Sequence, residues 1–380
     1  MALTTIQTNN KLIKFTQQVN REWVRENLFA PYMGESITAI IRKRMELTSG
    51  GEQMNIPLVA RLAATAIGSG ALAGNEESVD NYGMRVWIDW ARNAIKTNKA
   101  EKQKDSSAIF DVARPLLSDW LKELGRDETI DALYALPTES APAGLGSAAG
   151  QRVNGILFDS ATAAQRNTWV VDNADRVAFG ALNSNYSVTF ATATANLDVA
   201  GLDTANAANM RLLKRIARAA NPKIRPFKLK DGKEYFVCFH GSRTFRDLKT
   251  SLDTINSNVR PREGTGFDKN PIFQDGDQMY DGVIHREVPE IDTRAPTFYT
   301  TAGAAGIPVR PVWMCGQSAM AMAYGQMAKP TQLDNTDYQF NQGVGIETAY
   351  GVAKMFKKTL GGNLKEWGIA TGFYAAVADA

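Results

Sequence analysis

Apolar residues recur with helical spacing near the start of the chain. Phe15, Val19 and Trp23 occupy every fourth position of a segment otherwise rich in Lys, Arg and Glu. This spacing places them on one face of an amphipathic helix, and that face needs a partner surface to cover it. The next stretch turns basic at residues 42–44, a pattern more typical of a solvated face than of a binding patch.

Two strand-like segments are predicted, an outward strand over residues 52–62 and a return strand over residues 82–95. In the second strand Met84, Val86, Ile88 and Trp90 alternate with polar residues such as Arg85 and Asp89. The segment between them is rich in glycine and alanine and has little capacity to form a core. Because a long two-stranded excursion is only marginally stable alone, we expect it to lie against another molecule.

A second helix is predicted within residues 105–136, where apolar residues again follow helical spacing. Asp105 or Ser106 can cap its start. Pro115 should kink it or mark a break, and Gly125 can interrupt or end it. The following stretch, residues 137–155, has few large apolar residues, and its glycines are misspaced for a dinucleotide-binding turn, so we interpret it as a surface loop.

A third helix is predicted in residues 202–220, with Asp203 or Thr204 as its cap. Its apolar residues face one way, and the opposite side carries a basic stripe at positions i, i+3, i+4 and i+7, made of Arg211, Lys214, Arg215 and Arg218. This stripe is the best local candidate for an anionic partner, although a solvated face is the commoner origin of such a pattern.

The remainder of the chain alternates short apolar segments of strand and helix character, without a repeat or a heptad pattern. The expected fold class is α+β. The 380 residues are sufficient for two domains or for one large elaborated domain, and the hydrophobic content of 44% is that of a globular protein.

Charge and cysteine content narrow the function classes. The net charge of +3 gives no global excess that would indicate specific nucleic-acid binding. The two cysteines form no CxxC pair and cannot make a disulfide framework, so a reducing compartment is the simpler assumption. No apolar run has the length of a signal peptide or of a membrane span, which indicates a soluble, intracellular product.

One segment invites a chemical interpretation, because residues 270–291 place a histidine among carboxylates. An EF-hand loop beginning at Asp275 fails, since its sixth and twelfth positions hold Tyr280 and Arg286. A zinc site fails on local ligands, since His285 has only carboxylates nearby and His240 lies beside Cys238 elsewhere in the chain. We therefore interpret the segment as a polar turn followed by a short strand, and we predict no catalytic, cofactor-binding or metal-binding residues.

The order of elements is more informative than any single motif. An amphipathic arm, a long β excursion, a long helix, a compact α/β unit and returning strands resemble the major capsid proteins of tailed bacteriophages, the Hong Kong 97-like fold. Within that family the sequence is most similar to the podovirus branch typified by coliphage N-four. The collinear stretches that carry this resemblance are residues 36–62, 74–89, 225–250, 270–291, 312–326, 337–358 and 367–377, and it is weakest over residues 137–200.

The resemblance implies a domain layout and a role. Its segments would be an N-terminal arm (1–50), an extended loop (51–97), a peripheral domain with the spine helix and a loop-rich insertion (98–204), an axial domain (205–325) and a C-terminal return to the peripheral domain (326–380). The chain would self-assemble into hexamers and pentamers of the icosahedral shell that encloses the double-stranded DNA of a tailed phage. It would have no enzymatic activity and no cofactor, and it would assemble in the host cytoplasm.

Partners follow from the same resemblance. Phe15, Trp23, Trp87 and Trp90 are candidate intersubunit contacts, because extended segments offer apolar anchors to neighbouring copies. Some relatives cross-link their shells through a lysine in the extended loop, but residues 51–95 contain none, so we expect a non-covalent shell. Only a short arm precedes the loop, which favours a separate scaffolding protein. A portal protein, a decoration protein and non-specifically bound DNA are further expected partners.

Two other interpretations remain open on sequence grounds. An encapsulin-type shell has the same fold and encloses enzymes rather than DNA. An α+β hydrolase could use Asp275, Asp281 and His285 in acid–base chemistry, although no GxSxG nucleophile motif accompanies them.

Overall fold

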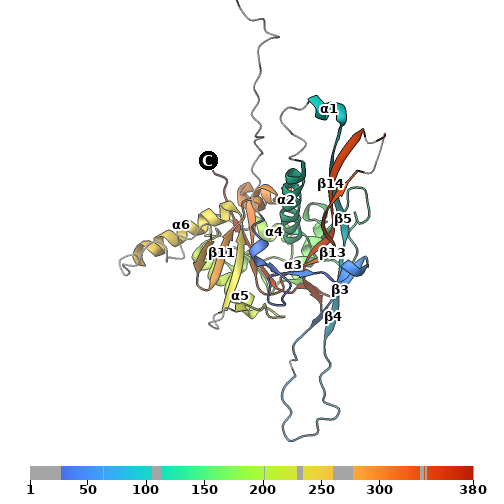
Figure 1. Cartoon of the computed structure of the whole chain (residues 1–380). Coiled ribbons are helices and arrows are strands. Elements are labelled where there is room, and N and C mark those ends of the chain that lie inside the picture. The colour runs from blue at the N-terminus through green and yellow to red at the C-terminus, as the bar shows by residue number, and fades with distance from the viewer. Residues whose placement is uncertain are drawn as a thin grey trace, which may run out of the picture. The chain divides into compact units, whose positions relative to one another are not determined.

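The computed structural model describes residues 27–62, 64–104, 113–200, 202–228, 234–259, 277–333, 338 and 340–379. The chain forms two compact units, one of Met1–Asn27, Ala91–Gly125 and Met327–Thr348, the other of Leu28–Trp90, Arg126–Gln326 and Ala349–Ala380. Helices and sheets are mixed along the chain (Figure 1), so the predicted α+β class is confirmed. No described helix is both long enough and apolar enough to span a membrane.

The helices and strands have the following bounds. The helices are α1 (Lys99–Lys104), α2 (Ala113–Tyr134), α3 (Ala163–Asp172), α4 (Phe190–Ala195), α5 (Ala207–Ala219), α6 (Ser242–Val259) and α7 (Glu290–Thr293). The strands are β1 (Met33–Gly34), β2 (Ile41–Arg44), β3 (Gln53–Val59), β4 (Asn81–Trp87), β5 (Asp89–Asn98), β6 (Val153–Asn154), β7 (Val177–Phe179), β8 (Phe227–Lys228), β9 (Glu234–His240), β10 (Asp277–Tyr280), β11 (Val283–Glu287), β12 (Val309–Cys315), β13 (Met320–Gln332), β14 (Asn341–Lys354), β15 (Phe356–Lys358), β16 (Leu364–Glu366) and β17 (Ile369–Ala375).

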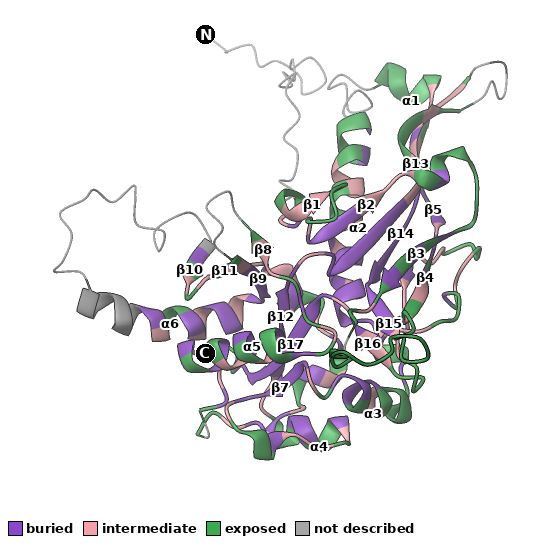
Figure 2. Cartoon of the chain, turned by 90° about the horizontal axis from the view of Figure 1, so that it is seen from below, coloured by how far each residue is buried: buried purple, intermediate pink, exposed green. Residues whose placement is uncertain are grey.

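The larger sheet, which lies in the second unit, has the strand order β10-β11-β9-β12-β17-β7, with β8 added to β9. Strand β9 is central, pairing in parallel with β11 and antiparallel with β12. Helices α5 and α6 pack against these strands, and the strands show as buried in Figure 2. Their shared core includes Leu213, Leu248, Phe236, Cys238 and Tyr374.

Both faces of β9 are covered, which explains its nearly continuous apolar sequence. Phe236 and Cys238 belong to the core beneath α5 and α6. Phe239 points to the other face, where its ring lies 4.9 Å from that of Phe29. Alternate side chains of one strand therefore serve two packing layers.

The second large sheet has the order β1-β2-β13-β14-β5, with β6 paired to β14. Strands β3 and β4 form a separate antiparallel pair, with Met54 opposite Val86 and Ile56 opposite Met84. These residues pack with small residues of β13 and β14, such as Ala321 and Ala353, in a second core. The connection from β3 to β4 is the long open loop at the bottom of Figure 1.

The strand predicted over residues 82–95 is two strands, and its alternation ends at Ile88 between them. Beyond that point the order of faces inverts, because Asp89 is buried whereas Trp90 is half exposed. The Asp89 carboxylate accepts hydrogen bonds from the backbone amides of Gly146 at 3.0 Å and Gln151 at 2.8 Å. These two hydrogen bonds hold the Asp89 side chain inside the protein, so the neighbouring Trp90 side chain faces the solvent. The prediction that Trp90 shares a face with Met84 is therefore wrong.

Two helix signals were also misinterpreted. Helix α2 continues past Gly125 to Tyr134, because its final turns bury Ile130 and Leu133. Helix α5 is capped by Asn206, whose side chain accepts from the amide of Asn209 at 2.9 Å. Asp203, one of the two predicted caps, instead accepts from the Ala181 amide at 2.7 Å. The predicted helix around Phe15, Val19 and Trp23, the proposed caps Asp105 and Ser106, and Asp275 lie outside the described residues.

Candidate functional site

The histidine of the carboxylate-rich segment sits on a well-defined hairpin. Strands β10 and β11 pair from Tyr280 and Val283 outward, and the turn between them is Asp281–Gly282. Both turn residues have positive φ, 49° and 69°, as an Asp–Gly type I′ turn requires. The hairpin directs Val283 and His285 toward the core under α5 and α6, and His285 is completely buried. Burial depresses the pKa of His285 to about 3, so its imidazole is neutral at physiological pH.

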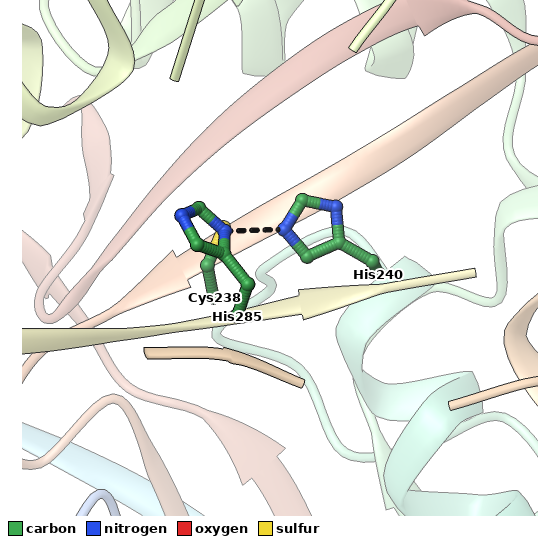
Figure 3. A group of neighbouring side chains, drawn as sticks. All are labelled: Cys238, His240 and His285. Carbon is green, nitrogen blue, oxygen red and sulfur yellow. Dashed lines mark hydrogen bonds between the residues drawn. The ribbon is translucent and has the colours of Figure 1, made fainter. Parts of the chain in front are cut away.

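His285 lies beside two residues that are distant in sequence. In the β9–β11 pair, His285 is in register with Cys238 and Glu287 with His240. The Nε2 atom of His240 and the Nδ1 atom of His285 are 2.9 Å apart, a hydrogen bond drawn in Figure 3. One ligand atom from each of Cys238, His240 and His285 lies within 4.8 Å of the other two.

This arrangement was not predicted, and treating His240 as part of an unrelated strand was wrong. A usable signal was present, because Cys238 and His240 are two residues apart in a predicted strand and so share a face. What the sequence lacked was the order of strands that places β11 next to β9. Burial raises the pKa of the Cys238 thiol and lowers that of His240 well below its ordinary value.

Two described carboxylates of the same segment, those of Asp281 and Glu287, are engaged away from His285. Asp281 forms an ion pair with Lys214, with 3.2 Å between Oδ1 and Nζ. Glu287 accepts a hydrogen bond of 2.7 Å from the Ser242 hydroxyl at the start of α6. The described residues therefore give the Asp281–His285 pair of the hydrolase hypothesis no acid–base geometry.

Only some side chains of the basic stripe of α5 are exposed to solvent. Arg211, Arg215 and Arg218 are exposed, and the Arg211 guanidinium lies over the Tyr280 ring at 5.2 Å. Lys214 is buried, and its Nζ atom donates to the carbonyl of Asp281. The interpretation of Lys214 as part of a solvated stripe is wrong, because the hairpin turn neutralises its charge.

Arg218 opens onto a groove of about 970 Å³ within the second unit. Six of the side chains that line this groove are basic, namely Arg61, Arg218, Lys223, Arg225, Lys357 and Lys365. Its acidic lining residues are Glu77, Asp80 and Glu234. The groove therefore presents an excess of positive charge beside the exposed end of α5.

The aromatic contact candidates differ in what they can offer. Trp87 is 9% exposed and packs within its own chain, whereas Trp90 is 50% exposed. Trp90 is therefore the better of the two as an intersubunit anchor. Phe15 and Trp23 lie outside the described residues. Sequence reasoning missed the large apolar side chains exposed at the base and along the loop between β3 and β4, namely Val59, Leu62, Ile67, Leu72 and Val79.

Comparisons with known proteins agree with this architecture. The model of the family described as phage capsid protein matches residues 4–376. The capsid protein of cyanophage Pam1 is 33% identical over 100% of both chains, with a TM-score of 0.86. That of Ralstonia phage GP4 is 18% identical over 100% of both chains, with a TM-score of 0.69. That of Helicobacter pylori bacteriophage KHP30 is 12% identical over 98% of this chain and 100% of the other, with a TM-score of 0.64.

The search of curated proteins found no match. The fold is the Hong Kong 97-like fold of phage capsid proteins, as predicted, and the family and its structural neighbours are structural proteins of virus shells. The chain belongs to the phage capsid protein family.

Proposed function

We propose that this chain is a major capsid protein whose copies form the hexamers and pentamers of an icosahedral shell around double-stranded DNA. The observation that carries the proposal is the family match over nearly the whole chain, together with 33% identity to a phage capsid protein over its full length. A role without enzymatic activity is proposed because the family and its structural neighbours are structural capsid proteins.

We assign the segments their capsid roles as follows. Residues 1–50 are the N-terminal arm, 51–97 the extended loop, 98–204 the peripheral domain with its spine helix, 205–325 the axial domain and 326–380 the return to the peripheral domain. The long loop between β3 and β4 and the long helix α2 support this assignment.

Neighbour contact is proposed at the extended loop and the arm. The exposed large apolar side chains between Val59 and Val79 lie in a loop whose described residues 61–79 are all exposed, which favours a covering surface. A second copy of this chain is the proposed cover. Trp90 adds an exposed aromatic anchor, and Phe15 and Trp23 are proposed to act in the same way from the arm.

The remaining partners are a scaffolding protein, a portal protein and a decoration protein, with assembly in the host cytoplasm. The exposed arginines of α5, Arg211, Arg215 and Arg218, are proposed to contact an anionic partner, and the basic groove beside Arg218 supports this. Contact with DNA is proposed to be non-specific and salt-dependent. We also place the chain in the N-four-like podovirus branch. A long tail on the phage that encodes this chain would refute that placement.

The mass of the native particle tests the main proposal. The chain is expressed alone and together with its candidate scaffolding protein, then examined by analytical ultracentrifugation and negative-stain microscopy. Uniform closed shells of megadalton mass are the expected result. A stable monomer or dimer under every condition would refute the capsid function, whereas closed shells from the chain alone would refute only the need for a scaffold.

A further inference from the structure

The buried trio of Cys238, His240 and His285 has the composition of a metal site. Cys238 and His240 project from the same face of β9, and His285 lies opposite Cys238 on β11. All three side chains are fully buried. Figure 3 shows the two imidazole rings meeting edge to edge next to the thiol. Thiolate and imidazole, the groups that these side chains can supply, are the preferred ligands of Zn²⁺ and Cu⁺.

Without an ion, the histidine pair leaves buried polar atoms unpaired. The hydrogen bond between the rings uses only one nitrogen of each. The other two, His240 Nδ1 and His285 Nε2, are buried without a hydrogen-bond partner. Whichever ring donates, one N–H group and one lone pair remain unsatisfied, and such groups are uncommon in protein interiors. The arrangement therefore calls for an explanation beyond ordinary core packing.

We propose that Cys238 Sγ, His240 Nε2 and His285 Nδ1 bind one thiophilic transition-metal ion, Zn²⁺ or Cu⁺. Bond lengths of about 2.05 Å to each nitrogen and tetrahedral angles place the two nitrogens roughly 3.3 Å apart. They are 2.9 Å apart in the structure. A separation of the rings by about 0.4 Å gives the two nitrogens this spacing, and Sγ, which lies within 4.8 Å of both, completes the site by moving closer to them.

The protons balance without a further reactant. The Cys238 thiol releases its proton to solvent as the thiolate forms its bond to the metal. The proton shared between the rings moves to a distal nitrogen, so each imidazole stays neutral and carries its N–H away from the ion. One proton leaves for each ion bound, and occupancy should rise with pH.

The neighbouring strands supply further groups suited to such a site. Gln278 lies directly opposite His285 in the β10–β11 pair, and its Oε1 atom is buried without a partner. Metal binding through Nδ1 leaves the proton of His285 on Nε2, and imidazoles that bind a metal usually donate this second N–H group. The Oε1 atom of Gln278 would accept that hydrogen bond. Met314 lies opposite Cys238 on β12 and belongs to the same core. Its thioether would favour Cu⁺ as the bound ion.

Metal content measured on the full-length chain tests the site. Because the trio is closed to solvent, the ion must enter during folding, so the chain is expressed in medium supplemented with zinc or copper salts and purified with a weak chelator under reducing conditions. About one ion per chain is expected by mass spectrometry of the metal. The metal that the chain retains, zinc or copper, identifies the ion. A lower copper occupancy in Met314→Leu than in the wild-type chain would show that the Met314 thioether also binds the ion.

The chain provides a matched control in its other cysteine. Cys315 is also fully buried, on the adjacent strand β12, but it is not part of the trio. Cys315→Ala should retain the ion, and Cys238→Ala should lose at least tenfold in occupancy. Equal occupancy in both variants would mean an adventitious ion only and would overturn the proposal, as would wild-type protein without metal.

A spectroscopic measurement on the wild-type chain tests the site even if the Cys238→Ala variant does not fold. Wild-type chain produced with Co²⁺ should show the absorption band of thiolate-to-cobalt charge transfer, because the Cys238 sulfur would bind the ion as a thiolate. Bound cobalt without that band would place the ion elsewhere and overturn the proposal. These outcomes do not depend on whether the chain forms shells, so the site and the capsid function fail or succeed separately.

Discussion

The apolar side chains exposed on the loop between β3 and β4 allow a quantitative test of assembly through neighbour contact. We consider the double variant Leu62→Ser and Leu72→Ser, because these side chains are 62% and 66% exposed in the subunit. Their replacement removes apolar surface that the described residues of the subunit leave uncovered. The core of the subunit loses nothing, so any large effect must arise in the assembled state.

The expected magnitude follows from the exposed area. Full burial of a leucine side chain is worth about 1.5–3 kcal/mol. About two-thirds of each side chain remains to be buried, which gives about 1–2 kcal/mol per residue and about 2–4 kcal/mol for the pair. Since 1.4 kcal/mol is tenfold in an equilibrium constant, each loop contact should weaken by about 30-fold to 700-fold.

The assay is the protein concentration at which shells form, followed by light scattering and checked by electron microscopy. The matched control is Leu182→Ser with Val188→Ser, since these residues are similarly exposed at 57% and 60% but lie outside the loop. The loop variant should require a much higher concentration than the control, with an unchanged thermal unfolding midpoint. An unaltered concentration, or an equal change in the control, would refute the assignment of the loop as a neighbour contact.

Three further predictions address covalent structure, acid stability and a buried carboxylate. Shells boiled in detergent should release monomers, because residues 51–95 contain no lysine; a ladder of multimers on a gel would contradict this. Burial lowers the pKa of His285 from 6.5 to about 3, so the unfolded chain takes up a proton at higher pH than the folded chain. The stability contributed by neutral His285 is therefore present above about pH 6.5 and is lost as the pH falls toward 3. Over this range the urea midpoint of unfolding should fall less steeply in His285→Gln than in the wild-type chain. Identical pH profiles of the two proteins would refute the argument. Asp89→Ala should destabilise the fold by about 2–6 kcal/mol in urea titrations, because it leaves two loop amides without acceptors at about 1–3 kcal/mol each, while Asp89→Asn should cost less; equal losses in the two variants would contradict the role of the acceptor.

Elements with a strong local signal could be predicted from sequence, and those decided by tertiary contacts could not. The strand signals that predict β3 and β4 are confirmed, and the apolar run that ends at His240 forms β9. Gly125 was misjudged because glycine costs only about 1 kcal/mol in a helix. Burial of Ile130 and Leu133 further along α2 contributes more than that.

The candidate sites also differ in whether local sequence or tertiary contacts define them. The basic stripe was visible because it lies within one helix, yet the burial of Lys214 depends on a hairpin turn that is distant in sequence. The metal-site candidate was invisible because no local ligand spacing unites its three residues. It follows from the parallel pairing of β9 with β11, whose histidines are 45 residues apart.

The two proposals concern different levels of organisation and can be separated by experiment. The second unit closes its own cores beneath α5 and α6 and between β3, β4 and the small residues of β13 and β14. The loop beyond β3 is therefore not required for the subunit fold, so loop variants should change the assembly concentration without changing thermal stability. Cys238 lies inside one of those cores, so Cys238→Ala should lower the thermal stability of metal-loaded protein more than Cys315→Ala does. Equal stability losses in the two cysteine variants would mean that cavity formation alone accounts for them and that the ion contributes nothing to the fold.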